Sequence, residues 1–246
     1  MLITTPAVIL QAFPYGDTSR IARLATRDVG VQSVIAKGAT RPRSRFGGRL
    51  QVLSVGVAQF YYRANRDLHT LGAFDVTVQH VALTADLRRF AAAAALAELV
   101  LRTAQEEPQP AVYHGLVAAL DALTAAPADR VPYEALAGLW HAVVVLGFAP
   151  TADACVRCGR DLGARAAFAL AEGGLLCAEC GTAAGPGALD PADQDALRGF
   201  LAGDATAAGL PERHLAAHRR LLVRFVRRHV ADDADLPALR FWESLT

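Results

Sequence analysis

The four cysteines of this chain form two Cys-x-x-Cys pairs, Cys155/Cys158 and Cys177/Cys180, separated by eighteen residues. Two such pairs at this separation are typical of a tetrahedral zinc site. A glycine follows the second cysteine of each pair, and such a turn allows backbone N–H groups to approach the sulfurs. The glycine-rich segment 151–187 is therefore predicted to be a zinc-binding insertion.

Four thiolates fill the coordination sphere of a tetrahedral ion and leave no position for water, which favours a structural role over a catalytic one. An iron–sulfur cluster is an alternative that would use the same ligands. The module could also contact nucleic acid through Arg157, Arg160 and Arg165. We favour the simpler interpretation, in which a Zn²⁺ ion holds an insertion between two parts of a helical domain.

Short apolar runs and turn residues alternate over the N-terminal third of the chain. The runs predicted as strands are 7–10, 21–25, 31–36, 50–62 and 69–78. Short strands separated by turn signals favour a small barrel or sandwich. A five-stranded OB-fold fits best, although the pattern alone does not exclude an SH3-like barrel.

The pattern becomes helical after Thr84, which we take as an N-cap. Helices are expected from Leu87, over 111–124 and after Pro132. A further helix is expected at Asp190-Pro191, where Asp suits the cap and Pro the first helical position. The residues expected to share one face of the first helix are Leu87, Phe90, Ala91, Ala94, Ala97 and Leu101.

The last long helix, predicted over 211–230, has two distinct faces. One side carries Leu215, His218, Leu222, Phe225, Val226 and His229. The other side carries Arg213, Arg220, Arg224, Arg227 and Arg228. Together these elements predict a multi-domain α+β protein. Its expected parts are an N-terminal OB-fold β-barrel (1–80), an α-helical domain in two pieces (81–150 and 188–246) and the inserted four-cysteine zinc module (151–187).

The sequence contains no recognisable targeting or membrane segment. The N-terminus lacks the basic region and cleavage site of a signal peptide. The most apolar stretch, 90–101, contains Glu98 and is too short to span a bilayer. All four cysteines belong to one cluster, so none remains for a disulfide, which fits a reducing compartment. We therefore expect a cytoplasmic protein.

Positive charge is concentrated near the N-terminus. The whole chain has a net charge of +1, but residues 1–70 carry ten Lys and Arg against three Asp and Glu. Five of these cations, and no acid, lie in one Gly/Pro/Arg-rich loop: Lys37, Arg41, Arg43, Arg45 and Arg49. Such a loop suits phosphate contacts, whose strength falls steeply with salt. The simplest alternative is a solvated loop without a partner.

Aromatic residues near this loop could add stacking to the phosphate contacts. Phe46, Tyr61 and Tyr62 are the candidates. Because Tyr61 and Tyr62 are adjacent on a predicted strand, only one of them can face outward, and the other is expected in the core.

Sequence signatures of the common catalytic classes are missing. The chain has no GxxxxGK[ST] loop for nucleotide hydrolysis and no GxSxG elbow. His214 and His218 are four residues apart on a helix, but the acid of an HExxH zinc protease motif does not lie between them. We therefore expect a protein that is not an enzyme.

The N-terminal motifs resemble those of the RecO family. In order, they are Ala7-Val8-Ile9-Leu10, Tyr15-Gly16-Asp17-Thr18-Ser19, Leu24-Ala25-Thr26-Arg27-Asp28-Val29-Gly30, Val34-Ile35-Ala36-Lys37-Gly38-Ala39 and Arg43-Ser44-Arg45. Asp17 stands where the family often has Glu, and the loop is richer in arginine. The order of barrel, helices and four-cysteine insertion also agrees, whereas the C-terminal helices carry no motif that can be matched by residue.

The resemblance implies a DNA repair and recombination mediator of the cytoplasm and nucleoid. RecO-like proteins bind single- and double-stranded DNA and anneal complementary strands. With RecR they help RecA to replace single-strand-binding protein on DNA, and they dock the acidic C-terminal tail of that protein. By matching position, the implied DNA contacts are Lys37, Arg41, Arg43, Arg45 and Arg49.

Two other functions fit the residues. In the first, the chain is a protein-interaction adaptor whose C-terminal arginine stripe docks an acidic tail peptide, and the barrel is a scaffold. In the second, the barrel is an RNA-binding OB-fold.

Overall fold

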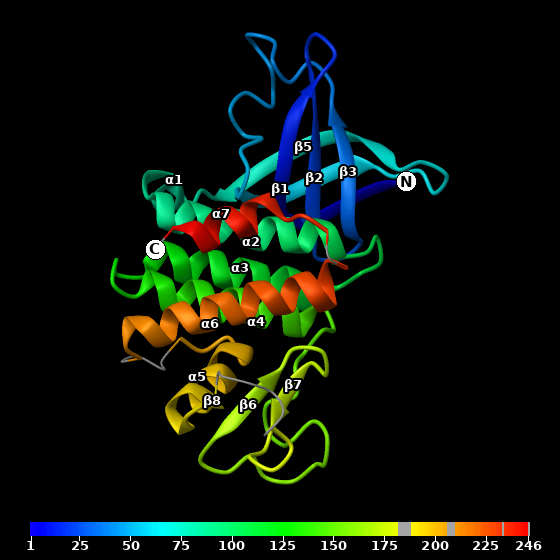
Figure 1. Cartoon of the computed structure of the whole chain (residues 1–246). Helices are drawn as coiled ribbons and strands as arrows, with labels where there is room; N and C mark the ends of the chain where they lie inside the picture. Colours follow the sequence, from blue (N-terminus) through cyan, green and yellow to red (C-terminus); the bar gives the residue numbers. More distant parts are fainter. Residues whose placement is uncertain (182–187, 206–209, 233, 246) are drawn as a thin grey trace. The chain divides into compact units, whose positions relative to one another are not determined.

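The computed structural model describes residues 1–181, 188–205, 210–232 and 234–245 (Figure 1). The last residues of the predicted zinc-binding insertion, 182–187, therefore lie outside the described part. The chain divides into two compact units, residues 1–124 and 125–246. The four-part domain division remains a prediction, and the two units are described in turn.

Five strands of the first unit form a closed barrel in the order β1-β2-β3-β5-β4. The strands are β1 (Leu2–Tyr15), β2 (Ser19–Thr26), β3 (Gly30–Ala36), β4 (Val55–Tyr61) and β5 (Leu68–Val78). All neighbouring pairs are antiparallel except β3 and β5, which are parallel. This is the predicted OB-like barrel.

The long first strand pairs with one neighbour along each of its two edges. Its first half pairs with β4 and its second half with β2, and a bulge lies between Ile9 and Gln11. A bulge bends a strand and increases its twist, which barrel closure requires. The enclosed core includes Ile9, Leu24, Phe46, Phe60, Leu71 and Phe74.

The strand predicted over 50–62 begins only at Val55. Residues before it form turns, and Leu53 has a φ of 69°. The prediction was wrong because the apolar residues here anchor a loop instead of alternating along a strand. Leu50 is buried in the barrel core, and Leu53 N–H donates to the carbonyl of Ile9 at the bulge (2.7 Å).

Three helices follow the barrel within the first unit: α1 (Val81–Ala85), α2 (Leu87–Thr103) and α3 (Pro110–Ala125). Asp86, not Thr84, caps α2, because its carboxylate accepts from the Arg89 N–H (2.9 Å). The Thr84 hydroxyl instead donates to the Val81 carbonyl within α1.

The predicted face of α2 is only partly the buried one. Leu87 and Phe90, predicted on the same face as the buried Ala91, are 58% and 40% exposed. The buried residues of this helix are Ala91, Ala92, Ala93, Ala95, Leu96, Ala97, Leu99 and Val100.

The second unit contains the remaining helices and a small sheet. The helices are α4 (Val131–Val145), α5 (Pro191–Leu201), α6 (Glu212–Phe225), the π-helical turn η2 (Val226–Val230) and α7 (Pro237–Ser244). The Asp190 carboxylate caps α5, as predicted. Helix α4 packs on both α5 and α6, and the rings of Trp140 and Phe225 lie 5.3 Å apart.

The sheet consists of β6 (Ala166–Ala169), β7 (Gly174–Leu176) and β8 (Ala188–Leu189), with β6 in the middle. Its strands β6 and β7 lie between the two cysteine pairs. None of the helices in the described part of the chain combines the length and the apolar composition that a membrane crossing requires.

Candidate nucleic-acid interface and metal centre

The four cysteine sulfurs converge on one point of the second unit. All lie within 4.8 Å of one another, and Cys158 Sγ is 3.8 Å from Cys177 Sγ. A tetrahedron with Zn–S bonds of about 2.3 Å has edges of about 3.8 Å, so the observed spacing fits a tetrahedral ion. The four cysteines can therefore hold one metal ion.

Two equivalent turns present these sulfurs. The N–H of Gly159 donates to the Cys155 carbonyl, and the N–H of Gly181 donates to the Cys177 carbonyl, both at 2.8 Å. Gly159 has a φ of +71°, which a residue with a side chain rarely adopts. The hairpin of β6 and β7 joins the turns, and the Val156 N–H donates to the Leu175 carbonyl (2.8 Å).

The environment of Cys158 favours its thiolate. The backbone N–H and guanidinium of Arg160 lower the pKa of the Cys158 thiol. Cys155 and Cys177 are buried, where an uncompensated thiolate would be costly. A bound cation supplies that compensation, since the thiolate is the metal-binding form.

The predicted DNA-contact loop is a chain of tight turns between β3 and β4. Successive backbone hydrogen bonds join Arg41 to Gly38, Ser44 to Arg41 and Gly47 to Ser44, at 3.0–3.2 Å. The N–H of Thr40 also donates to the carbonyl of Thr18 in the β1–β2 turn (3.0 Å).

Buried apolar residues fasten this loop to the barrel, while its cations face solvent. Ala39, Phe46 and Leu50 belong to the barrel core. The cations that are exposed are Lys37, Arg41, Arg43, Arg45 and Arg49. Arg49 lies 3.6 Å from Asp75, but both side chains are more than half exposed, so this ion pair contributes little.

The aromatic residues proposed for stacking separate into exposed and buried ones. Phe46 is 2% exposed, so its prediction as a stacking face was wrong. Tyr62 packs against the barrel core and lies 4.6 Å from the His69 ring, whereas Tyr61 is 55% exposed. The expectation that only one of the two tyrosines faces outward is confirmed.

The loop between β4 and β5 carries two further exposed cations, Arg63 and Arg66. They were missed because they do not stand in a continuous basic run. The signal that could have found them is their position between two predicted strands, since the loops of an OB-fold border its binding face.

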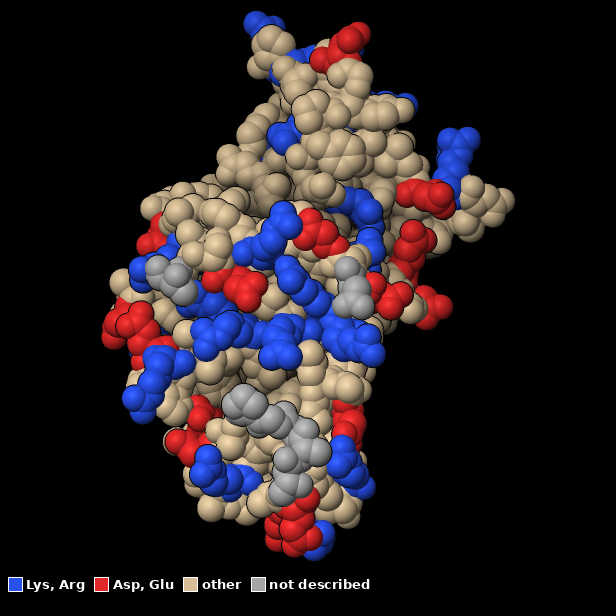
Figure 2. All heavy atoms as spheres, viewed as in Figure 1, with Lys and Arg blue, Asp and Glu red and all other residues tan. Residues whose placement is uncertain are grey.

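A second set of cations lies on α6 and η2. The exposed arginines of these helices are Arg213, Arg220, Arg224, Arg227 and Arg228. In Figure 2, Lys and Arg side chains gather in a band over α6. The other side of the helix buries Leu215, Leu222 and Phe225, which confirms its two faces.

A buried carboxylate, Asp193, pairs with both histidines of α6. Asp193 Oδ1 lies 2.8 Å from His214 Nδ1 and 3.2 Å from His218 Nε2. Burial lowers the pKa of His218, against the opposing effect of the Asp193 charge. Asp193 was not singled out from the sequence because nothing in the pattern connects α5 with α6.

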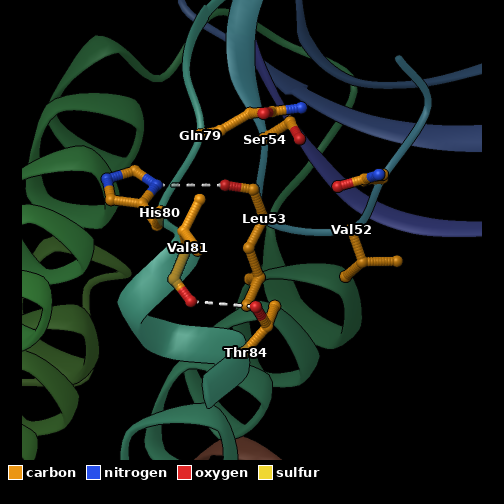
Figure 3. Close-up of a pocket in the computed structure, with 8 residues that line it drawn as sticks. Val52, Leu53, Ser54, Gln79, His80, Val81 and Thr84 are labelled. Atoms are coloured by element: carbon orange, nitrogen blue, oxygen red, sulfur yellow. Dashed lines mark hydrogen bonds between the residues drawn. The ribbon is translucent and has the colours of Figure 1, made fainter. Parts of the chain in front are cut away.

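A small hollow lies in the first unit near α1 (Figure 3). The His80 ring points toward the Leu53 carbonyl (3.2 Å), and its other nitrogen meets Asp121 Oδ1 (2.9 Å). The hollow measures about 40 Å³. Ligand pockets usually measure about 300–1,000 Å³, so this space suits water molecules, not a nucleotide.

Comparison with known families covers almost the whole chain. A profile described as "Recombination protein O N terminal" matches residues 1–79, and one described as "Recombination protein O C terminal" matches residues 84–236.

Individual proteins show the same similarity. The "DNA repair protein RecO" of Rubrobacter xylanophilus is 35% identical over 235 residues, which cover 93% of this chain and 91% of the relative. The protein of that name from Anaeromyxobacter sp. strain Fw109-5 is 34% identical over 247 residues, covering 97% and 94%. That of Streptomyces griseus is 29% identical over 251 residues, covering 98% and 99%.

Proposed function

The chain belongs to the RecO family of DNA repair proteins, and from this premise we propose that it binds single- and double-stranded DNA and anneals complementary strands. With a RecR-like partner, it mediates RecA loading onto DNA coated by single-strand-binding protein. It acts in the cytoplasm, at the nucleoid. Its activity is binding and exchange of strands, and it is not an enzyme.

The observation that carries the proposal is the anchored basic loop. Three buried residues fix the loop to the barrel, and five exposed cations stand on it without an acid in the same segment. Anchoring reduces the conformational entropy that the loop would lose on binding. Cations held in this way attract the phosphate backbone and carry little base information.

The salt dependence of binding tests this loop. Each phosphate contact contributes a slope of about −0.9 to the logarithm of affinity against the logarithm of salt concentration for duplex DNA, and about −0.7 for single strands. Changing Arg41, Arg43 and Arg45 to Ala is expected to reduce the slope by up to about 3 units for a duplex and about 2 for a single strand.

The matched control is Arg88→Ala with Arg102→Ala, two arginines of α2 outside the barrel. An unchanged slope in the loop variant, or an equal change in the control, would refute the loop as the contact. RNA of the same sequence is measured beside DNA, and a clear preference for RNA would favour the RNA-binding interpretation.

We further propose that Cys155, Cys158, Cys177 and Cys180 bind one structural Zn²⁺. The sulfur spacing supports a tetrahedral ion. Zinc would join the two turns of a segment whose described strands, β6 and β7, have only four and three residues. A hairpin this short is too small to be stable alone.

The arginine stripe of α6 and η2 supports a second role as a docking surface. Its exposed cations could hold the acidic tail of single-strand-binding protein, which is the adaptor function considered above. Direct titration with an acidic tail peptide tests this role against that of a solvated helix face. No binding, or binding unaffected by Arg224→Glu with Arg228→Glu, would remove this role.

A further inference from the structure

The second half of β1 places two aromatic rings on the outside of the barrel. Beyond the bulge, Ala12 packs toward the core, whereas Phe13 and Tyr15 are 39% and 52% exposed. The neighbouring outward position, Gln11, is also exposed. The bulge thus determines that these rings face out of the barrel and not into its core.

The strand register extends this surface across three strands. Phe13 pairs with Ile21 of β2, and Ile21 pairs with Ile35 of β3. Directly paired residues point to the same side of a sheet, so these side chains form one outward row. The strands β1, β2 and β3 lie side by side in Figure 1.

Cations border this row. Arg23 occupies the next outward position of β2 and pairs with Gln11 of β1. Lys37 follows β3 directly, and Arg41 belongs to the loop that is hydrogen-bonded to the β1–β2 turn through Thr40 and Thr18. A flat apolar strip with cations at its edge matches a ligand that has aromatic faces and a phosphate backbone.

We propose that Phe13 and Tyr15 form a base-stacking platform that gives the barrel a preference for single-stranded DNA. This inference rests on the proposed function. It adds which form of DNA, single-stranded or duplex, this surface prefers. A duplex hides its base faces and offers only phosphates and groove edges, whereas a single strand exposes the faces.

The spacing of the rings agrees with unstacked bases. Residues two apart on a strand are separated by about 6.6 Å, at about 3.3 Å per residue. Bases in a duplex repeat every 3.4 Å along each strand. The two rings therefore suit neighbouring bases that have been drawn apart, which an extended single strand allows without breaking base pairs.

The test measures the affinity of the full-length, zinc-loaded protein for a dT20 oligonucleotide and for a 20-base-pair duplex by fluorescence anisotropy. Stacking is worth about 1–3 kcal/mol per base. With one base on each ring, Phe13→Ala with Tyr15→Ala should therefore weaken dT20 binding by at least about 30-fold and duplex binding by less than about twofold. The salt slope should stay unchanged, because stacking releases no counterions.

Two further variants separate stacking from loss of fold. Phe13→Leu with Tyr15→Leu keeps apolar volume but removes the flat rings, so it should weaken dT20 binding like the alanine pair. Phe13→Tyr with Tyr15→Phe should retain the affinity. Phe90→Ala, on α2, removes a ring that is 40% exposed, similar to Phe13, and should change neither affinity.

The outcomes distinguish this proposal from the proposed function. If the unaltered protein binds DNA with a loop-dependent salt slope but the alanine pair binds dT20 normally, the platform is refuted and the function stands. Equal weakening for dT20 and duplex also refutes the platform. If the unaltered protein binds neither oligonucleotide, both proposals fail.

Discussion

One buried aromatic ring determines how the basic loop is presented. Phe46 inserts into the barrel core, and the guanidinium of its neighbour Arg45 lies 5.0 Å from the ring centroid. The ring thus acts as an anchor and leaves the cations outside. A charged loop held by an apolar side chain does not depend on ion pairs for its shape, and such pairs would partly neutralise its charge.

Removing this anchor is expected to affect stability first. Phe46→Ala should lower the free energy of unfolding by about 3–5 kcal/mol, the usual cost of deleting a buried phenylalanine. Arg45→Ala, which removes only the exposed cation, should cost less than about 1 kcal/mol. Urea denaturation measures both. Equal costs would show that the ring does not anchor the loop.

Buried histidines make stability depend on pH. Burial lowers the pKa of His218, and it also lowers the pKa of His69 in the barrel. The folded chain therefore binds fewer protons than the unfolded chain, whose histidines titrate near about 6.5. Stability is fully present above that pH and decreases as the pH falls below it.

Urea denaturation at pH 8 and pH 5.5 checks this expectation for His218. The unaltered protein should be less stable at pH 5.5, and His218→Gln should show a smaller loss between the two pH values. His114→Gln, at an exposed position of α3, is the matched control and should behave like the unaltered protein. The idea fails if His218→Gln retains the full pH dependence.

At the scale of elements, the cysteine module depends on the ion that we propose for it. Its described strands are short, and its two cysteine turns come from distant parts of the segment. Without an ion, the sulfurs would be four converging thiols that no longer hold the turns together. Metal binding and local folding should therefore be linked.

Elemental analysis should find about one zinc per chain in the unaltered protein. Cys155→Ser or Cys177→Ser should abolish this metal binding. The melting temperature should fall by more than about 5 °C, at about 2–4 °C per kcal/mol for a chain of this size. DNA affinity should change far less. Arg165→Ala, in the same segment, is the control. A stable, metal-free variant that loses DNA binding would show that the module contacts DNA.

The helices differ in how well the sequence predicted their buried faces. Helix α6 was clear because arginines on one side and large apolar residues on the other mark two faces. Helix α2 was not, since the run of alanines around Ala91–Ala95 is buried on several sides and small residues mark no face. Leu87 and Phe90 then dominated the pattern although both are exposed.

The candidate sites also differ in how well the sequence predicted them. The cysteine ligands are local in sequence, so their spacing predicted the cluster. The outward rings of Phe13 and Tyr15 were not recognised, because the strand was predicted only over 7–10, whereas β1 continues past the bulge to Tyr15. Pairings that depend on distant segments, such as Asp193 with His218, require the fold.

At the scale of the whole molecule, charge is unevenly distributed. The net charge of +1 conceals ten cations against three acids in residues 1–70, and the exposed arginines of α6 and η2 form a second positive surface. Two positive surfaces on one chain can serve different partners. The loop suits phosphates, and the stripe suits either an acidic peptide or solvent.

Annealing of complementary oligonucleotides, bare or coated with single-strand-binding protein, separates these roles. Changing Arg41, Arg43 and Arg45 to Ala should slow annealing of both substrates, because each requires DNA contact. Arg224→Glu with Arg228→Glu should slow only the coated substrate, since only that one presents an acidic tail. A reversed charge near such a tail repels it.

Arg240→Glu is the control for the stripe, because it reverses a charge on α7 of the same unit that already faces Asp235 at 3.2 Å. It should leave both annealing rates nearly unchanged. If the stripe variant slows bare and coated strands equally, the stripe contacts DNA and not the tail. If it slows neither, the stripe is a solvated helix face, and recognition of coated DNA must lie elsewhere on the chain.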